Sequence, residues 1–129
     1  MDVDDTQKQL TMYFCVNKSL GMSKGKIASQ VGHAVQQLVE NILEIYSTSK
    51  KEKQIYTNYK IWKNGCKKII LKGTHTDLLE LQINPDAVSI YDAGKTQVEA
   101  NSLTCVGFYP TNNTNRFKKY KLLFSYCSR

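Results

Sequence analysis

The sequence predicts an α/β fold: a single-domain, three-layer sandwich with a mixed β-sheet of four to five strands flanked by helices. Two observations support this fold class. An apolar run at 11–17 is followed by a long helical pattern, and the later apolar runs are short and separated mostly by turn residues. A length of 129 residues suits one domain, so we expect a frayed tail over 1–10 and one domain over 11–129.

The first helix is expected to start near Lys24 or Gly25, because apolar residues then recur at spacings of three and four. They form one stripe along the helix: Ile27, Val31, Ala34, Val35, Leu38, Ile42 and Ile45. Three polar residues lie beside this stripe: Gln30, His33 and Gln37. For His33 we weigh a place at a functional site against packing near a helix interface, and we favour packing.

A second helix is predicted after the polar break at 47–53, ending in a glycine cap at Asn64-Gly65. One face of this helix would carry Ile55, Tyr59 and Trp62. We expect Trp62 to belong to the core rather than to form a platform for a nucleic-acid base.

The remaining elements are short. Residues 67–72 form a strand whose consecutive apolar residues indicate cover on both faces. Thr76-Asp77 would cap a brief helix, and the Asn-Pro-Asp turn at 84–86 leads into a strand at 87–91. Two further strands and the loop between them complete the prediction: 103–109, 120–126 and 111–116.

The chain is basic, with a net charge of +7 and a pI of about 9.2. Excess positive charge suggests a polyanionic partner such as nucleic acid, although solubility alone is an equal alternative. The sequence shows no signal peptide and no apolar stretch near the ~18 residues of a membrane span. We therefore expect a cytoplasmic protein with no membrane partner.

The four cysteines show no Cys-x-x-Cys spacing, and only His33 and His75 could join them, so we expect no metal site. Cys15 and Cys105 lie in apolar runs, where a thiol acts as a small hydrophobic group. We expect all four cysteines to be reduced, as is usual in the cytosol.

The strongest chemical signal is the turn Gly21-Met-Ser-Lys-Gly-Lys26, between the first strand and the first helix. It is not a P-loop, because only three residues separate its glycines and Ile27 follows Lys26 in place of Ser or Thr. Lys24 and Lys26 nevertheless lie at a helix N-terminus, where lysine is electrostatically disfavoured. Two lysines beside exposed N–H groups indicate a site for a phosphate or a developing negative charge, rather than a solvated turn.

A second polar group follows the strand at 87–91, with Asp92 at its end and Thr96 and Thr104 beyond it. In open α/β sheets, functional groups gather where strands end. A carboxylate there can act as a general base or orient water, and hydroxyls can position water. An ordinary turn followed by a strand explains the same residues, and spacing alone favours that interpretation.

Together these segments resemble the peptidyl-tRNA hydrolase family of the archaeal and eukaryotic type. The matching motifs occur in order over about residues 11–123: Gly21-Met-Ser-Lys-Gly-Lys-Ile-Ala-Ser-Gln-Val-Gly-His-Ala34, Trp62 with Gly65, Lys68-Ile-Ile-Leu-Lys72, Asp92-Ala-Gly-Lys-Thr-Gln97, Ser102-Leu-Thr-Cys105 and Lys121-Leu-Leu123. Some positions depart from the family pattern. Ser23 stands where the family usually has glycine, Asn17 and Ser19 replace an arginine and an aspartate, and the segment 73–88 is short.

The resemblance implies hydrolysis of the ester between a peptide and the 3′ ribose of tRNA, with no metal or cofactor, usually by a homodimer. The family's catalytic lysine and aspartate match Lys26 and Asp92, and its site threonines match Thr96 and Thr104. Substrate-binding positions are expected around them: Lys24, Gly25, Gln30, His33, Lys95 and Gln97. Further lysines are candidates for tRNA phosphates: Lys63, Lys67, Lys118 and Lys119.

Two alternatives stay open. The chain could be a catalytically inactive tRNA- or RNA-binding module on the same fold, which would keep the basic face without the site residues. It could also be a protein-interaction domain whose charge serves solubility. The joint presence of Lys26, Asp92 and the two threonines favours the enzyme.

Overall fold

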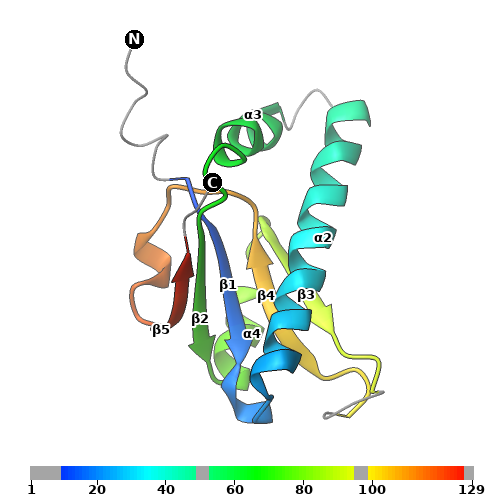
Figure 1. Cartoon of the computed structure of the whole chain (residues 1–129), viewed down its shortest axis with the longest axis vertical. Coiled ribbons are helices and arrows are strands. Elements are labelled where there is room, and N and C mark those ends of the chain that lie inside the picture. Colours follow the sequence, from blue (N-terminus) through cyan, green and yellow to red (C-terminus); the bar gives the residue numbers. More distant parts are fainter. Residues whose placement is uncertain (1–9, 49–52, 95–98, 127–129) are drawn as a thin grey trace.

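The computed structural model describes residues 10–48, 53–94 and 99–126 (Figure 1). Five strands form one mixed sheet in the order β3-β4-β1-β2-β5: β1 Met12–Asn17, β2 Lys68–Gly73, β3 Ala87–Tyr91, β4 Leu103–Phe108 and β5 Lys121–Tyr126. The described helices are α2 Lys24–Thr48, α3 Lys53–Trp62 and α4 His75–Leu81, with 3-10 turns η1 Lys18–Leu20 and η2 Asn115–Phe117. The predicted α/β class with a mixed sheet is confirmed. The tail predicted over 1–10 lies almost wholly outside the described residues.

The strand directions bring the ends of three strands to one edge of the sheet. β1 and β2 are parallel, whereas β4 is antiparallel to β1 and β3 is antiparallel to β4. β3 therefore runs in the same direction as β1 and β2, and the C-terminal ends of all three lie at one edge. The turn after β1 starts α2 at this same edge (Figure 1). This is where open α/β sheets place their functional groups.

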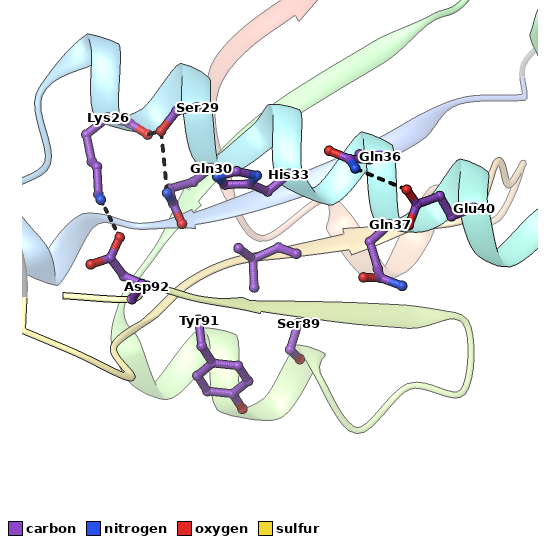
Figure 2. Close-up of a pocket in the computed structure, with 12 residues that line it drawn as sticks. Lys26, Ser29, Gln30, His33, Gln36, Gln37, Glu40, Ser89, Tyr91 and Asp92 are labelled. Carbon is purple, nitrogen blue, oxygen red and sulfur yellow. Dashed lines mark hydrogen bonds and ion pairs between the residues drawn. The ribbon is translucent and has the colours of Figure 1, made fainter. Parts of the chain in front are cut away.

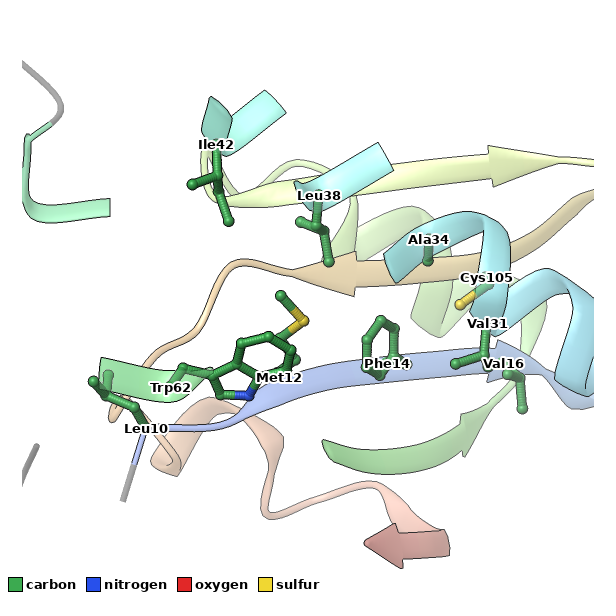
Figure 3. Close-up of a cluster of buried hydrophobic side chains, with 10 residues drawn as sticks. All are labelled: Leu10, Met12, Phe14, Val16, Val31, Ala34, Leu38, Ile42, Trp62 and Cys105. Atoms are coloured by element: carbon green, nitrogen blue, oxygen red, sulfur yellow. The ribbon is translucent and has the colours of Figure 1, made fainter. Parts of the chain in front are cut away.

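Alternating side chains of β1 separate the core into two layers. Met12, Phe14 and Val16 face α2 and α3, in a cluster that also contains Leu38 and Trp62 (Figure 3). The intervening Tyr13 and Cys15 face the other side of the sheet, with α4 and η2: Leu71, Leu78, Leu81, Leu103, Val106, Phe108 and Phe117. The chain is thus a three-layer sandwich, as predicted, and Trp62 belongs to the core.

Helix α2 begins as the sequence predicts and lies close against the sheet. The Ser23 hydroxyl accepts the Lys26 N–H at 3.2 Å, which is an N-cap that glycine could not supply. Four residues of the predicted stripe are buried: Val31, Ala34, Leu38 and Ile42. A Cβ at Gly107 of β4 would lie 3.1 Å from the Phe14 ring and 3.2 Å from the Ala34 Cβ, so glycine allows this close contact.

Two predicted caps lie at other residues. The predicted glycine cap at Asn64-Gly65 is wrong, because Cys66 is the residue with a left-handed backbone, at φ 55°. The brief helix α4 begins one residue before Thr76, and Thr74 caps it. Thr74 and Asp77 exchange side-chain to backbone hydrogen bonds of 3.2 and 2.9 Å, which forms a capping box.

Candidate active site

Lys26 and Asp92 meet at the edge where β1, β2 and β3 end (Figure 2). Lys26 lies in the first turn of α2, and Asp92 directly follows β3. The Lys26 Nζ donates to Asp92 Oδ1, and the two side chains are only 8% and 5% exposed. The other carboxylate oxygen, Oδ2, accepts the Gly94 N–H at 2.6 Å. Two charges from distant parts of the chain thus form one partly buried ion pair.

The backbone around Asp92 fixes its carboxylate in this position. The Asp92 N–H donates to the Ser102 carbonyl at 2.9 Å, and the Asp92 carbonyl accepts the Asn101 N–H at 2.7 Å. Gly94 has a φ of +77°, and a Cβ on it would lie 2.6 Å from atoms of Ala100. Only glycine fits this turn without strain, and the turn directs the Gly94 N–H to the carboxylate.

The contacts of Asp92 also set its charge. The hydrogen bond from Lys26 lowers the pKa of Asp92 below its ordinary value, and the Gly94 N–H and the charges of Lys26 and His33 act in the same direction. Burial opposes these effects without overcoming them. Asp92 is therefore ionised at neutral pH, as an ion pair with Lys26 requires.

The ion pair opens onto a polar cleft of about 520 Å³ between α2 and β3. One wall is the face of α2 on which side chains recur at spacings of three and four: Lys26, Ser29, Gln30, His33, Gln36, Gln37 and Glu40. The other wall comes from β3 and the residues after it: Ser89, Ile90, Tyr91, Asp92 and Ala93.

Gln30 and Thr104 connect the cleft to the buried side of α2. Thr104 is fully buried, and its hydroxyl lies 2.6 Å from Gln30 Oε1 and 3.1 Å from the Ile90 carbonyl. The helical pattern placed Gln30 beside the apolar stripe, but only 3% of it is exposed. Thr104 thus does not line the cleft, and its hydroxyl contacts Gln30, which does.

His33 is exposed and lines the cleft, so the packing role favoured from the sequence is wrong. It lies seven residues after Lys26, two helical turns away, and therefore shares its face of α2. Lys24 and Gly25 are exposed in the first turn of α2. Three further predicted site residues fall outside the described part of the chain: Lys95, Thr96 and Gln97.

Several residues that line the cleft were not predicted from the sequence: Ser29, Gln36, Glu40, Ser89 and Tyr91. A signal for the helical ones was present, because they continue the spacing of Lys26, Gln30, His33 and Gln37. Nothing in the spacing indicates that β3 forms the opposite wall, since that depends on how α2 lies across the sheet.

Thiol chemistry at this site is disfavoured by burial. Cys15 and Cys105 are buried and have free thiols, and neither lines the cleft. Burial raises the pKa of Cys15 to about 12, with a contribution from the Asp77 charge, and burial also raises the pKa of Cys105. Both thiols stay protonated at neutral pH and are poor nucleophiles.

Within residues 10–48, 53–94 and 99–126, His, Cys, Asp and Glu side chains nowhere gather in a group of three that could hold a metal ion. None of the described helices is long and apolar enough to cross a membrane.

The fold and the site together define an α/β protein with a lysine–aspartate pair at the end of a polar cleft. The family described as Peptidyl-tRNA hydrolase PTH2 matches residues 10–123. The chain is 38% identical over 105 residues to the peptidyl-tRNA hydrolase of Sulfurisphaera tokodaii, which covers 77% of this chain and 84% of that protein. It is 40% identical over 108 residues to the peptidyl-tRNA hydrolase of Sulfolobus acidocaldarius, and this match covers 78% of this chain and 87% of that protein. The peptidyl-tRNA hydrolase of Thermoplasma acidophilum is 32% identical over 121 residues, and this match covers 87% of this chain and 97% of that protein. The chain belongs to the PTH2 family of peptidyl-tRNA hydrolases, which confirms the resemblance found in its sequence.

Proposed function

We propose that the Lys26–Asp92 pair is the catalytic centre at which this chain hydrolyses the ester bond between peptide and tRNA, so that the tRNA is released for reuse. The observation that carries this proposal is the ion pair itself, which lies partly buried at the end of a cleft in a chain of the PTH2 family. In the family resemblance, these same two residues match the catalytic lysine and aspartate.

Ester hydrolysis needs a water molecule directed at the carbonyl carbon and a positive environment for the tetrahedral oxyanion. Lys26 and the N–H groups at the start of α2 supply that environment. An efficient general base has a pKa near the working pH, whereas the pKa of Asp92 is lowered by Lys26. We therefore assign Asp92 to orienting the water and holding Lys26 in place, rather than to storing a proton.

The two threonines enter this proposal differently. Thr104 is a positioning residue, because its buried hydroxyl contacts the Gln30 amide that lines the cleft. Thr96 keeps the role implied by the family resemblance, positioning water or the leaving ribose.

The proposed tRNA-binding surface lies at the same edge of the sheet as the ion pair. Lys72 of β2 and Lys121 of β5 are direct cross-strand partners, an unfavourable pairing of like charges unless an anion lies between them. Lys18 and Lys24 extend this basic edge on η1 and the first turn of α2. Lys63 and Lys67 lie at the other end of β2, so we leave them out of this surface.

Binding through this basic edge predicts a strong dependence on salt. The logarithm of the binding constant should fall by about 0.7–0.9 per phosphate contact for each unit of log salt concentration. Lys121→Ala should make this slope shallower by about 0.7–0.9, the contribution of one phosphate contact. Lys53→Ala in α3 should leave the slope unchanged. An unchanged slope in Lys121→Ala would remove this residue from the tRNA surface.

We infer a homodimer in the cytoplasm, where translation supplies the substrate. Leu122 and Leu123 of the edge strand β5 are 58% and 40% exposed, and apolar side chains at an open sheet edge favour pairing with a second copy. Sedimentation equilibrium of the purified chain tests this inference, and a monomer at all concentrations would contradict it.

The decisive experiment measures release of free tRNA from an N-acyl-aminoacyl-tRNA by the purified chain. Asp92→Asn should lower turnover by about 10², because the amide neither pairs with the Lys26 charge nor orients water as the carboxylate does. Circular dichroism and thermal unfolding must show that the variant is folded. Near-normal turnover in folded Asp92→Asn would refute the assigned role. A wild-type chain that binds tRNA without hydrolysing the substrate would instead support the inactive binding module.

A further inference from the structure

One wall of the cleft is an unpaired strand edge. β3 lies at the end of the sheet and pairs with β4 alone among the described strands. The Tyr109 N–H donates to the Asp86 carbonyl, and the Asp92 N–H donates to the Ser102 carbonyl. Residues 86 and 92 thus direct their main chain toward the β4 side. The register shift between Ile90 and Tyr91 leaves the extra residue, Thr104, on β4, so the alternation along β3 is kept. Ser89 and Tyr91 therefore direct their N–H and C=O groups away from β4, toward the open edge.

The side chains of these two residues point away from α2, as Figure 2 shows. The Ser89 hydroxyl lies 3.3 Å from Gln82 Oε1, and the Tyr91 hydroxyl lies 3.0 Å from the same atom. Gln82 follows α4, on the opposite side of the sheet from α2. Since both residues still line the cleft, they do so with their main chain. The cleft therefore offers a row of backbone donors and acceptors that ends at Asp92.

We propose that the peptide part of the substrate binds as an added strand on the open edge of β3, with its main chain hydrogen-bonded to Ser89 and Tyr91. This inference rests on the proposed function and names how the peptide part is recognised. An extended peptide that joins a sheet edge is held through its backbone, and its side chains contribute only selectivity. Such binding would accept peptides of many sequences.

The position of the ion pair fixes the direction and length of the bound peptide. The esterified C-terminus must lie at Lys26 and Asp92, just beyond the C-terminal end of β3, so the peptide runs parallel to β3. β3 has five residues. At about 3.3 Å per residue, its edge can hold a peptide of roughly four residues before the chain passes out of the cleft.

This geometry also separates peptidyl-tRNA from aminoacyl-tRNA. An aminoacyl ester has a free amine and no preceding carbonyl to accept a hydrogen bond from the β3 edge. A peptidyl ester has at least one such carbonyl. The backbone edge thus favours substrates with an acylated amino group, without any pocket for a particular side chain.

The first test compares substrates of increasing peptide length, from N-acetyl-aminoacyl-tRNA to peptides of five residues, in wild type, Ser89→Pro and Ser89→Ala. Proline removes the outward N–H of Ser89 and is tolerated at an edge position whose N–H does not pair. Alanine removes only the hydroxyl. In wild type and Ser89→Ala, kcat/KM should rise with length and level off near four residues. Ser89→Pro should lose about tenfold on long peptides and little on the N-acetyl substrate.

The second test uses the wild-type chain, so it does not depend on whether the proline variant folds. Single N-methyl groups are placed at successive peptide nitrogens of a four-residue substrate. A bound strand predicts that kcat/KM falls at every second nitrogen, because alternate N–H groups face β3. Hydrolysis with no dependence on length and no alternation would overturn the β3 proposal and leave the proposed function intact. Hydrolysis of none of the substrates would overturn the proposed function itself.

Discussion

Two partly buried ion pairs among the described residues differ in their surroundings. In one, Arg116 donates two hydrogen bonds of 2.8 and 2.5 Å to the Asp86 carboxylate. The Cζ of its guanidinium lies 4.9 Å from the centre of the Phe108 ring and 4.8 Å from that of Phe117. In the other, the Lys26 Nζ donates to Asp92 Oδ1 beside a polar cleft. The Arg116–Asp86 pair fastens η2 to the turn before β3, whereas the Lys26–Asp92 pair faces open space.

The difference lies in geometry and access rather than in charge. The planar guanidinium matches both carboxylate oxygens, so the Arg116–Asp86 pair leaves little capacity for a ligand. The Lys26 ammonium is a compact charge without the fork geometry of a guanidinium, and it lies at the cleft. The Lys26–Asp92 pair is therefore accessible to a substrate. We expect substitutions at the first pair to affect stability and substitutions at the second to affect turnover.

The largest expected effect is on catalysis, in Lys26→Ala. Removing a preorganised positive group at the oxyanion should lower kcat by about 10²–10³. The control is Lys53→Ala, because Lys53 also lies in the first turn of a helix, α3, and does not line the cleft. Turnover by the two variants on one substrate gives the comparison, and equal kcat values would show that Lys26 is dispensable.

A smaller effect, on stability alone, is expected from Arg116→Ala. The variant loses the bidentate pair and the contact with two aromatic rings. Because the paired side chains are 20% and 30% exposed, solvent screens the pair, and we expect a loss of about 2 kcal/mol in the free energy of unfolding. Urea unfolding measures the loss, while kcat should stay within about twofold of wild type. A large fall in kcat with unchanged stability would reverse the roles assigned to the two pairs.

The smallest expected effect is a dependence of stability on acidity, contributed by Asp92. Its pKa is lower in the folded chain than its ordinary value of 3.8, so the unfolded chain binds the proton more readily. The stabilisation is complete above that value and is lost as the pH falls below it, through the lower pKa of the folded state. The free energy of unfolding of wild type and Asp92→Asn, measured between about pH 7 and 3, tests this. It should fall less steeply with decreasing pH in the variant than in wild type. Parallel curves would contradict the lowered pKa.

The sequence determined the elements and the identity of the chain. The evidence for them is local: the period of the apolar residues in α2, the short apolar runs of the strands and the motifs around Lys26 and Asp92. Local patterns can be recognised in a sequence without knowledge of the fold. The two helix caps were misplaced because alternatives within a few residues, such as Thr74 and Thr76, differ only by details of backbone conformation.

Only the tertiary structure decided how the site is built. The strand order places β3 at an edge, the close contact at Gly107 sets α2 across the sheet, and together they leave His33 exposed and Thr104 buried. These outcomes depend on contacts between residues far apart in the chain, which no spacing in one sequence encodes. The chemistry of the site was thus visible in its residues, whereas the shape of the cleft and its open backbone edge came from packing.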